Sequence, residues 1–190
     1  MNNDTEKFRT FIGIKPDDAA LAFINDFKQQ QSQEPWIKQI RWTPEPNIHI
    51  TMRFLGDLRL EQIQQIETGL RNLLEDQPAF AVTITPPQPF PGVKKARMLA
   101  TLIHKNDDLQ QLAAGIETIA VEAGVAPEER PFRGHMTVGR FRKPPKGLEE
   151  LLANTNTLIM PIDNVVLFKS ELKPTGAEYS EIAKFTLQAS

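Results

Sequence analysis

The chain has 190 residues, of which 40% are hydrophobic and 24% are charged, and its formal net charge is −2. A chain of this length and composition can form one substantial core or two small lobes that share a cleft. The charge excludes a protein that coats nucleic acid through overall basicity, and the absence of cysteine excludes disulfides, zinc knuckles and thiol nucleophiles.

The chain shows no targeting or membrane-spanning segment. Its first ten residues are polar and lack the apolar stretch of a signal peptide, and no run of about 18 apolar residues occurs anywhere. We therefore expect a cytoplasmic protein without a membrane span.

The pattern of apolar residues in the first half of the chain predicts alternating strands and helices. In chain order, the pattern predicts a strand at 8–14, a helix from about 16 to 28, a strand at 49–55 that ends at Gly56, a helix at 60–74 and a strand at 80–85.

The second half of the chain continues this alternation. Four prolines within residues 86–92 remove backbone donors and predict an irregular loop. Residues 174–176 have the composition of a hairpin turn between two long strands. The elements expected in this half are a strand at 97–103, a helix at 109–123 that stops near Gly124, a strand that begins at His135, a Pro-Pro loop, a short helix at 148–152, and strands at 165–172 and 179–187.

Two of the three histidines lie in matching short patterns, His49-Ile50-Thr51-Met52 and His135-Met136-Thr137-Val138. In a strand, residues i and i+2 share a face, so each histidine should lie about 6–7 Å from its threonine along the strand. The first pattern alternates between an apolar face and a polar face that is free for chemistry. The apolar face comprises Ile48, Ile50, Met52 and Phe54, and the polar face comprises His49, Thr51 and Arg53.

The two patterns are nearly half the chain apart, and each is accompanied by strands and an amphipathic helix. This repetition predicts an α+β fold in which residues 1–190 form a single domain of two similar lobes. Each lobe would contribute one His-x-Thr strand to a shared groove. No glycine-rich phosphate loop follows any of the predicted strands.

Two histidines in one groove can hold complementary protonation states near neutral pH. A neutral imidazole can take a proton from a nucleophile while a protonated one gives a proton to a leaving group. This pairing suits in-line displacement at a phosphodiester, with threonine hydroxyls and a guanidinium holding the non-bridging oxygens. Such a reaction needs no metal ion or other cofactor.

A local excess of basic residues surrounds the second pattern and favours an anionic substrate. By simple alternation, Arg140 falls on the same face as Met136 and Val138 and would point into the core. Gly139 permits a bulge or a strand end, either of which can turn Arg140 towards the groove. The charged residues of this region are Arg130, Arg133, Arg140, Arg142, Lys143 and Lys146 against Glu128 and Glu129.

The segments 49–56 (HITMRFLG) and 130–140 (RPFRGHMTVGR) closely resemble the two signature segments of the RNA 2′,3′-cyclic phosphodiesterases. This family, also called the 2′-5′ RNA ligases, belongs to the two-histidine (2H) phosphoesterases. Residues 11–14 (FIGI) and 170–179 (SELKPTGAEY) extend the resemblance over most of the chain. It implies a bilobed, pseudo-symmetric fold with two antiparallel-rich sheets and flanking helices around a central cleft that carries both His-x-Thr motifs.

The resemblance also implies an activity, namely hydrolysis of the terminal 2′,3′-cyclic phosphate of RNA to a 2′-phosphate. By analogy, His49 is the acid that protonates the departing O3′, and His135 is the base that activates water. Thr51 and Thr137 match the threonines that contact phosphate, and Arg140 matches the arginine that follows the second motif. The implied partners are RNA ends or nucleotides with a 2′,3′-cyclic phosphate, with no obligate protein partner.

Several residues keep two interpretations. Arg53 either contacts phosphate or forms a cross-strand salt bridge, and the basic residues around Arg142 either guide RNA or are solvated. The aromatic rings of Phe11, Phe54 and Phe132 are interpreted as mostly core, with base stacking as the alternative. We interpret His104 as a solvated strand end, because no threonine follows it two residues later.

Three other functions remain as alternatives. The first is the reverse reaction, in which the same histidines join a 2′,3′-cyclic end to a 5′-hydroxyl without ATP. The second is an RNA- or nucleotide-binding module without catalysis, although simple binding needs no matched acid and base. The third is a metallohydrolase, which we disfavour because it needs three or four close ligands and the chain has no His-Glu-x-x-His spacing.

Overall fold

Antiparallel strands dominate the part of the chain that the computed structural model describes, residues 6–143, 145–174 and 176–189. Eight strands form the main sheet, seven of them in the order β10-β9-β1-β3-β7-β6-β5, with β2 also paired to β7, while β4 and β8 form a separate ribbon. The strands are β1 (Phe8–Ile14), β2 (Ile40–Trp42), β3 (Ile50–Leu58), β4 (Phe80–Ile84), β5 (Gln88–Phe90), β6 (Met98–Leu102), β7 (His135–Phe141), β8 (Leu158–Ile162), β9 (Asn164–Lys173) and β10 (Gly176–Thr186).

Three α-helices and four short 3-10 helices complete this described part. The α-helices are α1 (Asp18–Gln30), α2 (Leu60–Leu74) and α3 (Asp107–Glu122). The 3-10 helices cover Pro35–Gln39, Glu45–Asn47, Val93–Lys95 and Glu149–Ala153. The hairpin turn expected at 174–176 includes Thr175, which lies outside the described residues. No helix in the described ranges is long and apolar enough to cross a membrane.

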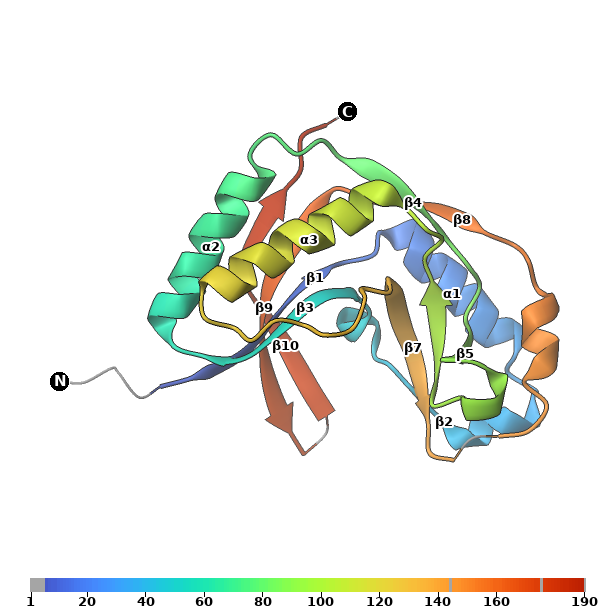
Figure 1. The fold of residues 1–190 in the computed structure, drawn as a ribbon. Helices are drawn as coiled ribbons and strands as arrows, with labels where there is room; N and C mark the ends of the chain where they lie inside the picture. The colour runs from blue at the N-terminus through green and yellow to red at the C-terminus, as the bar shows by residue number, and fades with distance from the viewer. Residues whose placement is uncertain (1–5, 144, 175, 190) are drawn as a thin grey trace.

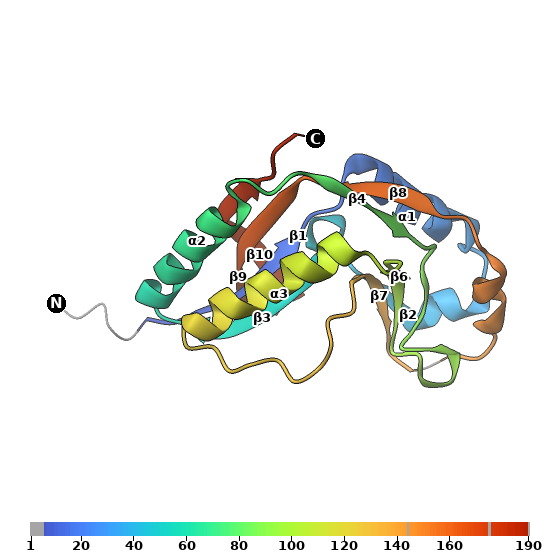
Figure 2. The same cartoon turned by 45° about the horizontal axis from the view of Figure 1, so that its top comes forward.

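Helices α1 and α3 begin where a side chain accepts a hydrogen bond from one of their first backbone N–H groups. The Asp17 carboxylate accepts a hydrogen bond from the Ala20 N–H at 2.9 Å, and the Asn106 side chain accepts one from the Leu109 N–H at 2.8 Å. In Figures 1 and 2, α2 and α3 lie side by side over the half of the sheet that contains β1, β3, β9 and β10, and α1 lies with the β4–β8 ribbon over the other half.

The two halves of the main sheet are joined at one point. Strands β3 and β7 pair through a single residue pair, Ile50 with Met136, and both side chains are fully buried. On one side of this joint lie β1, β9 and β10, and on the other lie β2, β5 and β6. The predicted α+β class with antiparallel pairing is therefore confirmed, and the two expected sheets are continuous through this joint.

The prediction of an irregular loop over 86–92 is wrong in its centre. Residues 88–90 form β5, which pairs with β6 at the edge of the main sheet. Proline is tolerated there because one side of an edge strand makes no ladder hydrogen bonds. The pattern also fails to indicate β2, which has three residues, and β8, which contains Pro161.

The side-chain alternation predicted along β3 is also wrong beyond Met52. Two register shifts against β1 leave Met52 and Leu55 without a paired residue on β1, and Gly56 adopts a φ of 76°. Each shift changes which residues face the core. As a result, Leu55 is buried, while Phe54, expected on the core face, is 62% exposed.

A bulge in β7 likewise exposes Arg140, which simple alternation would point into the core. Thr137 pairs with Ala100 and Gly139 pairs with Leu99, so Val138 is an extra residue in β7. Val138 and Gly139 are consequently both buried, and Arg140 is exposed. The expected bulge at Gly139 is confirmed. A Cβ atom at Gly139 would lie 2.6 Å from Ile40 Cδ1 and 3.1 Å from Trp42 Cε3, so close packing of β2 requires glycine here.

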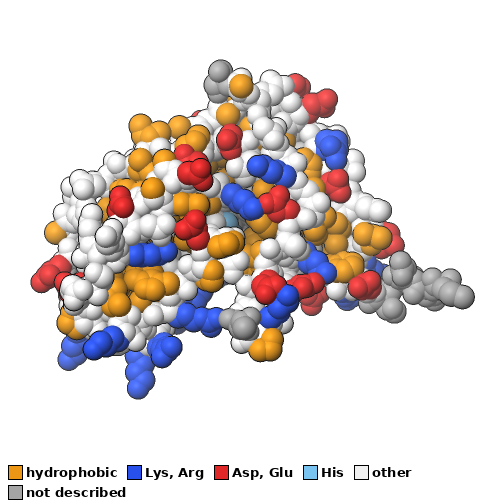
Figure 3. Space-filling view, turned by 180° about the vertical axis from the view of Figure 1, so that it is seen from behind, with side chains coloured by type: hydrophobic (Ala, Val, Ile, Leu, Met, Phe, Trp, Pro, Cys, Tyr) orange, Lys and Arg blue, Asp and Glu red, His pale blue; other side chains and the backbone are white. Residues whose placement is uncertain are grey.

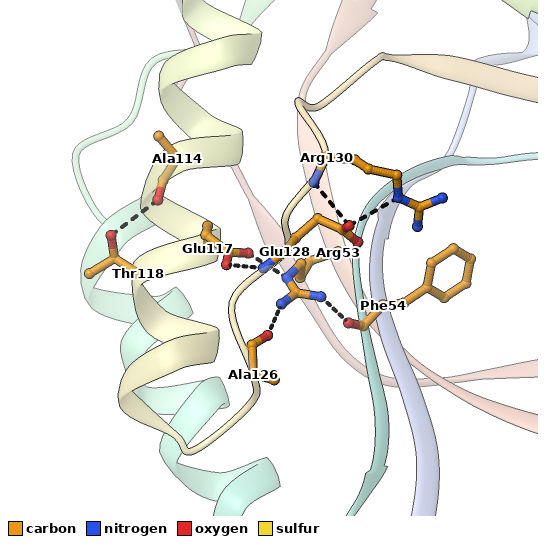
Figure 4. A network of polar contacts seen from close by, with 8 residues as sticks. All are labelled: Arg53, Phe54, Ala114, Glu117, Thr118, Ala126, Glu128 and Arg130. Atoms are coloured by element: carbon orange, nitrogen blue, oxygen red, sulfur yellow. Dashed lines mark hydrogen bonds and ion pairs between the residues drawn. The ribbon is translucent and has the colours of Figure 1, made fainter.

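Arg53 ties β3 to α3 and to the loop that leads into β7 (Figure 4). Its guanidinium donates to the carboxylate of Glu117 and to the carbonyl oxygens of Phe54 and Ala126. The same Glu117 carboxylate accepts a hydrogen bond from the Glu128 N–H at 2.9 Å. Of the two interpretations of Arg53, the structure contains the salt bridge, although to a helix and not across strands.

We predict that Glu117→Ala lowers the free energy of unfolding by about 1–3 kcal/mol, because the Arg53 side chain, only 10% exposed, loses its carboxylate partner. Glu67→Ala is the matched control, since Glu67 pairs with Arg71 within a helix and is 34% exposed against 31% for Glu117. We expect the control to change stability by less than about 0.5 kcal/mol. Urea unfolding followed by circular dichroism measures both, and equal effects would contradict a structural role for the Arg53 network.

Candidate active site

The two His-x-Thr patterns meet at the joint between β3 and β7. Because Ile50 pairs with Met136 in an antiparallel register, His49 lies towards Thr137 and Thr51 lies towards His135. All four side chains are on the face opposite the buried Ile50–Met136 pair. These four residues and Arg140 line one pocket of about 240 Å³, which we call the histidine pocket. Every site residue predicted from the sequence therefore lies in one cavity.

His49 lies immediately before β3 and is held at both ring nitrogens. Its Nδ1 is 2.8 Å from the carbonyl oxygen of Asn47, to which it donates, and its Nε2 is 3.1 Å from Thr51 Oγ1. The ring packs against Phe11, with centroids 4.7 Å apart, and meets Tyr179 edge-on at 5.3 Å. This packing and the Nδ1 hydrogen bond fix the tautomer and leave Nε2 as the reactive nitrogen.

Burial lowers the pKa of His49 below its ordinary value, because the cation loses hydration in this aromatic surrounding. The Asn47 carbonyl opposes this effect by stabilising the protonated ring, and the positive charge of His135 reinforces it. The charge of His135 therefore acts on the ionisation of His49.

His135 is the first residue of β7 and repeats part of this geometry. Its Nδ1 donates to the carbonyl oxygen of Arg133 at 2.8 Å, again two residues earlier in the chain. Its ring stacks on Phe90, with centroids 4.8 Å apart and an angle of 16° between the planes. Both histidines thus use Nδ1 to bond the backbone, which directs Nε2 away from that hydrogen bond.

The other predicted residues differ in how they are held. Thr137 Oγ1 lies 3.4 Å from the Met98 sulfur. Sulfur is a weak hydrogen-bond acceptor, so the hydroxyl remains available to donate to a stronger acceptor. Arg140 is exposed at the rim of the histidine pocket, where the bulge in β7 places it. The threonine hydroxyls and the guanidinium can surround an anion between the two imidazoles.

A second hollow adjoins the histidine pocket and shares Thr51, Phe54 and His135 with it. This hollow of about 560 Å³, which we call the aromatic hollow, is also lined by Phe90, Phe132, Arg130 and Arg133. Figure 3 shows a histidine side chain in the middle of one face, between hydrophobic and charged side chains, and basic side chains along the lower left edge. The two hollows together offer one site for an anion and one for a flat apolar group.

Sequence reasoning missed several residues of these hollows. Asn47, Trp42 and Tyr179 line the histidine pocket, and Phe90 contacts His135. Tyr179 belongs to a segment that supported the family resemblance, but its distance from His49 in the sequence gives no sign of contact. Phe90 lies in the segment interpreted as an irregular loop.

Other candidates lie outside the histidine pocket. His104 is exposed, as predicted, and lines neither this pocket nor the aromatic hollow. Arg142, Lys143 and Lys146 are also exposed and line neither cavity. Within the described ranges, no group of three or more His, Cys, Asp or Glu side chains is arranged to hold a metal ion.

Comparison with known proteins places this chain in a family. The RNA 2′,3′-cyclic phosphodiesterase of Methanothermobacter thermautotrophicus is 26% identical over 186 residues, which cover 95% of this chain and all of the relative. The protein of the same name from Bacillus subtilis is 28% identical over 178 residues, covering 93% of this chain and 95% of the relative.

Solved structures share the fold. The protein TT0787 of Thermus thermophilus aligns with a TM-score of 0.77 at 21% identity, covering 95% of this chain and 98% of that one. E. coli LigT in its apo form aligns with a TM-score of 0.76 at 18% identity, covering 96% of this chain and 99% of that one.

The family model described as 2′-5′ RNA ligase superfamily matches residues 16–174. The chain belongs to the 2′-5′ RNA ligase superfamily.

Proposed function

We propose that this protein hydrolyses the terminal 2′,3′-cyclic phosphate of RNA to a 2′-phosphate. The observation that carries the proposal is the convergence of His49, Thr51, His135 and Thr137 in one pocket with Arg140 at its rim. Family membership and the relatives named RNA 2′,3′-cyclic phosphodiesterase support it. We propose RNA ends or nucleotides with a cyclic phosphate as the substrates.

In the proposed mechanism, the cyclic phosphate lies between the two imidazoles. His135 Nε2 accepts a proton from water as the water oxygen attacks phosphorus. The bond between phosphorus and O3′ breaks, and His49 Nε2 donates its proton to O3′. Thr51, Thr137 and Arg140 stabilise the negative charge on the non-bridging oxygens. His49 regains a proton and His135 loses one to solvent before the next turnover.

The same residues can also join RNA ends, with a 5′-hydroxyl oxygen attacking the cyclic phosphate in place of water. His135 then takes the proton of that hydroxyl, the bond between phosphorus and O3′ breaks as His49 protonates O3′, and the product is a 2′-5′ linkage. Both reactions are available to one acid–base pair because they differ only in the nucleophile. Water is far more concentrated than any RNA 5′ end, so we propose hydrolysis as the net direction.

Phe54 is the part of the site best suited to the nucleobase. It is the only aromatic side chain in the described ranges that is both large and mostly exposed, and it lines both hollows. A base stacked on this ring would place its ribose near Thr51 and His135, at the boundary between the hollows. Arg130 and Arg133, which line the same hollow, can attract the RNA backbone.

We predict that His49→Ala and His135→Ala each reduce hydrolysis of an oligoribonucleotide with a 2′,3′-cyclic end by about 10² or more. Neither side chain belongs to the buried core, so circular dichroism should show an intact fold. His104→Ala is the matched control and should retain full activity. Near-normal turnover in either folded variant would contradict the acid–base pair, and binding without turnover by the unaltered protein would favour a non-catalytic module.

The pH profile of kcat/KM should rise and then fall, because the reaction needs neutral His135 and protonated His49. The lowered pKa of His49 moves one limb of the free-enzyme profile to a pH below the ordinary histidine value of about 6.5. The bound phosphate anion stabilises protonated His49, so the corresponding limb of kcat should lie at higher pH. His49→Gln should remove the falling limb from the residual activity, and an unchanged limb would contradict the assignment of His49 as the acid.

We predict that Phe54→Ala raises KM for a nucleoside 2′,3′-cyclic phosphate about tenfold or more, because stacking contributes about 1–3 kcal/mol per base. Phe54→Trp should retain binding. Ribose 2′,3′-cyclic phosphate without a base should be affected less than about twofold. Ile159→Ala is the matched control, because Ile159 is similarly exposed but lines neither hollow. Equal effects on both substrates would contradict stacking on Phe54.

A further inference from the structure

The two histidines of the pocket are held to different degrees. His49 is bonded at both nitrogens and packed by Phe11 and Tyr179. His135 has the Nδ1 hydrogen bond to the Arg133 carbonyl, and the described residues provide no hydrogen bond to its Nε2. The imidazole rotates about its Cβ–Cγ bond, and one hydrogen bond at Nδ1 restrains this rotation less tightly than contacts at both nitrogens do. A contact on the face of the ring restrains it further.

Phe90 provides this contact. The nearly parallel stacking, at 16° and 4.8 Å, covers one face of the His135 ring. The guanidinium carbon of Arg133 lies 5.0 Å from the centroid of the same Phe90 ring. Phe90 therefore contacts both the histidine side chain and the residue whose carbonyl bonds it. Rotation of the imidazole would lose this stacking interaction.

The backbone around Phe90 is itself well fixed. Phe90 pairs with Met98 across β5 and β6, and its carbonyl oxygen accepts a hydrogen bond from the Arg97 N–H at 3.0 Å. The ring is half-buried, and the preceding Pro89 is buried. Met98 in turn contacts the Thr137 hydroxyl through its sulfur. The β5–β6 hairpin thus supports the side chains of both residues of the second His-x-Thr pattern.

We propose that Phe90 is a positioning residue for His135, which fixes the plane of the imidazole so that Nε2 points at the attacking water. This inference rests on the proposed function for its effect on turnover, whereas its structural part can be tested without any substrate. Phe90 acts through His135 and takes no part in proton transfer. Loss of alignment by a fraction of an ångström is expected to lower the rate of the chemical step more than substrate binding.

The first arm of the test is kinetic. Phe90→Ala should lower kcat about tenfold or more and change KM less than about threefold. Phe90→Tyr, which keeps the ring, should restore kcat, and Phe90→Leu, which keeps most of the volume without the ring, should not. Phe141→Ala is the matched control, since Phe141 is a half-buried aromatic residue of the same strand as His135 but packs on Trp36.

The second arm is a double-mutant cycle. If Phe90 acts through His135, adding Phe90→Ala to the His135→Ala variant should reduce the residual activity less than about twofold. A further loss as large as that in the unaltered protein would overturn the proposal, because Phe90 would then act on the substrate or on the fold.

The third arm is spectroscopic and does not depend on activity. Removal of the stacked Phe90 ring should move the ring-proton resonances of His135 downfield, while those of His49 and His104 stay in place. Unchanged His135 resonances would overturn the proposal even if turnover fell. Shifted resonances without any cyclic phosphodiesterase activity in the unaltered protein would support the positioning role and refute the proposed function.

Discussion

The Ile50–Met136 contact between β3 and β7 is the constraint on which the site depends. Each of these fully buried side chains follows a histidine in the sequence. Burying the two together necessarily brings His49 and His135 to the opposite face of the same joint. Because the ladder contains only this pair, the strands separate on either side of it, and the histidine pocket lies at this point of separation. Core packing and the arrangement of the proposed catalytic side chains thus have one cause.

Around this joint, the surroundings of the two histidines are unequal although their backbone contacts are alike. His49 is enclosed by rings from three strands of one half of the sheet, which makes protonation costly in the free protein. His135 rests on one ring from the other half and lines both hollows. Burial favours the neutral form of His49 in the free protein, and an anionic substrate between the two imidazoles would favour its protonated form.

Much of this arrangement could be predicted from the sequence. Long apolar stripes indicate α2 and α3, because the helical period is unambiguous over four turns. The two His-x-Thr patterns indicate the paired strands, because apolar and polar side chains alternate regularly at residues 48–52. Alternation fails where register shifts occur. It places Phe54 in the core, although this residue lies in the site, whereas Gly139 correctly indicates the bulge that exposes Arg140. The contacts of Phe90 and Tyr179 come from strand pairing between distant segments, which periodicity does not encode.

We propose that His49 and His135, brought together by one buried contact, add water to the phosphorus of a cyclic phosphate and break its bond to O3′. The most direct test is incubation of an oligoribonucleotide that ends in a 2′,3′-cyclic phosphate in water enriched with oxygen-18, followed by mass spectrometry and assignment of the phosphate position by phosphorus NMR. The account predicts a terminal 2′-phosphate that carries one solvent oxygen. A 3′-phosphate product, or a cyclic end that stays intact with the unaltered protein, would contradict it.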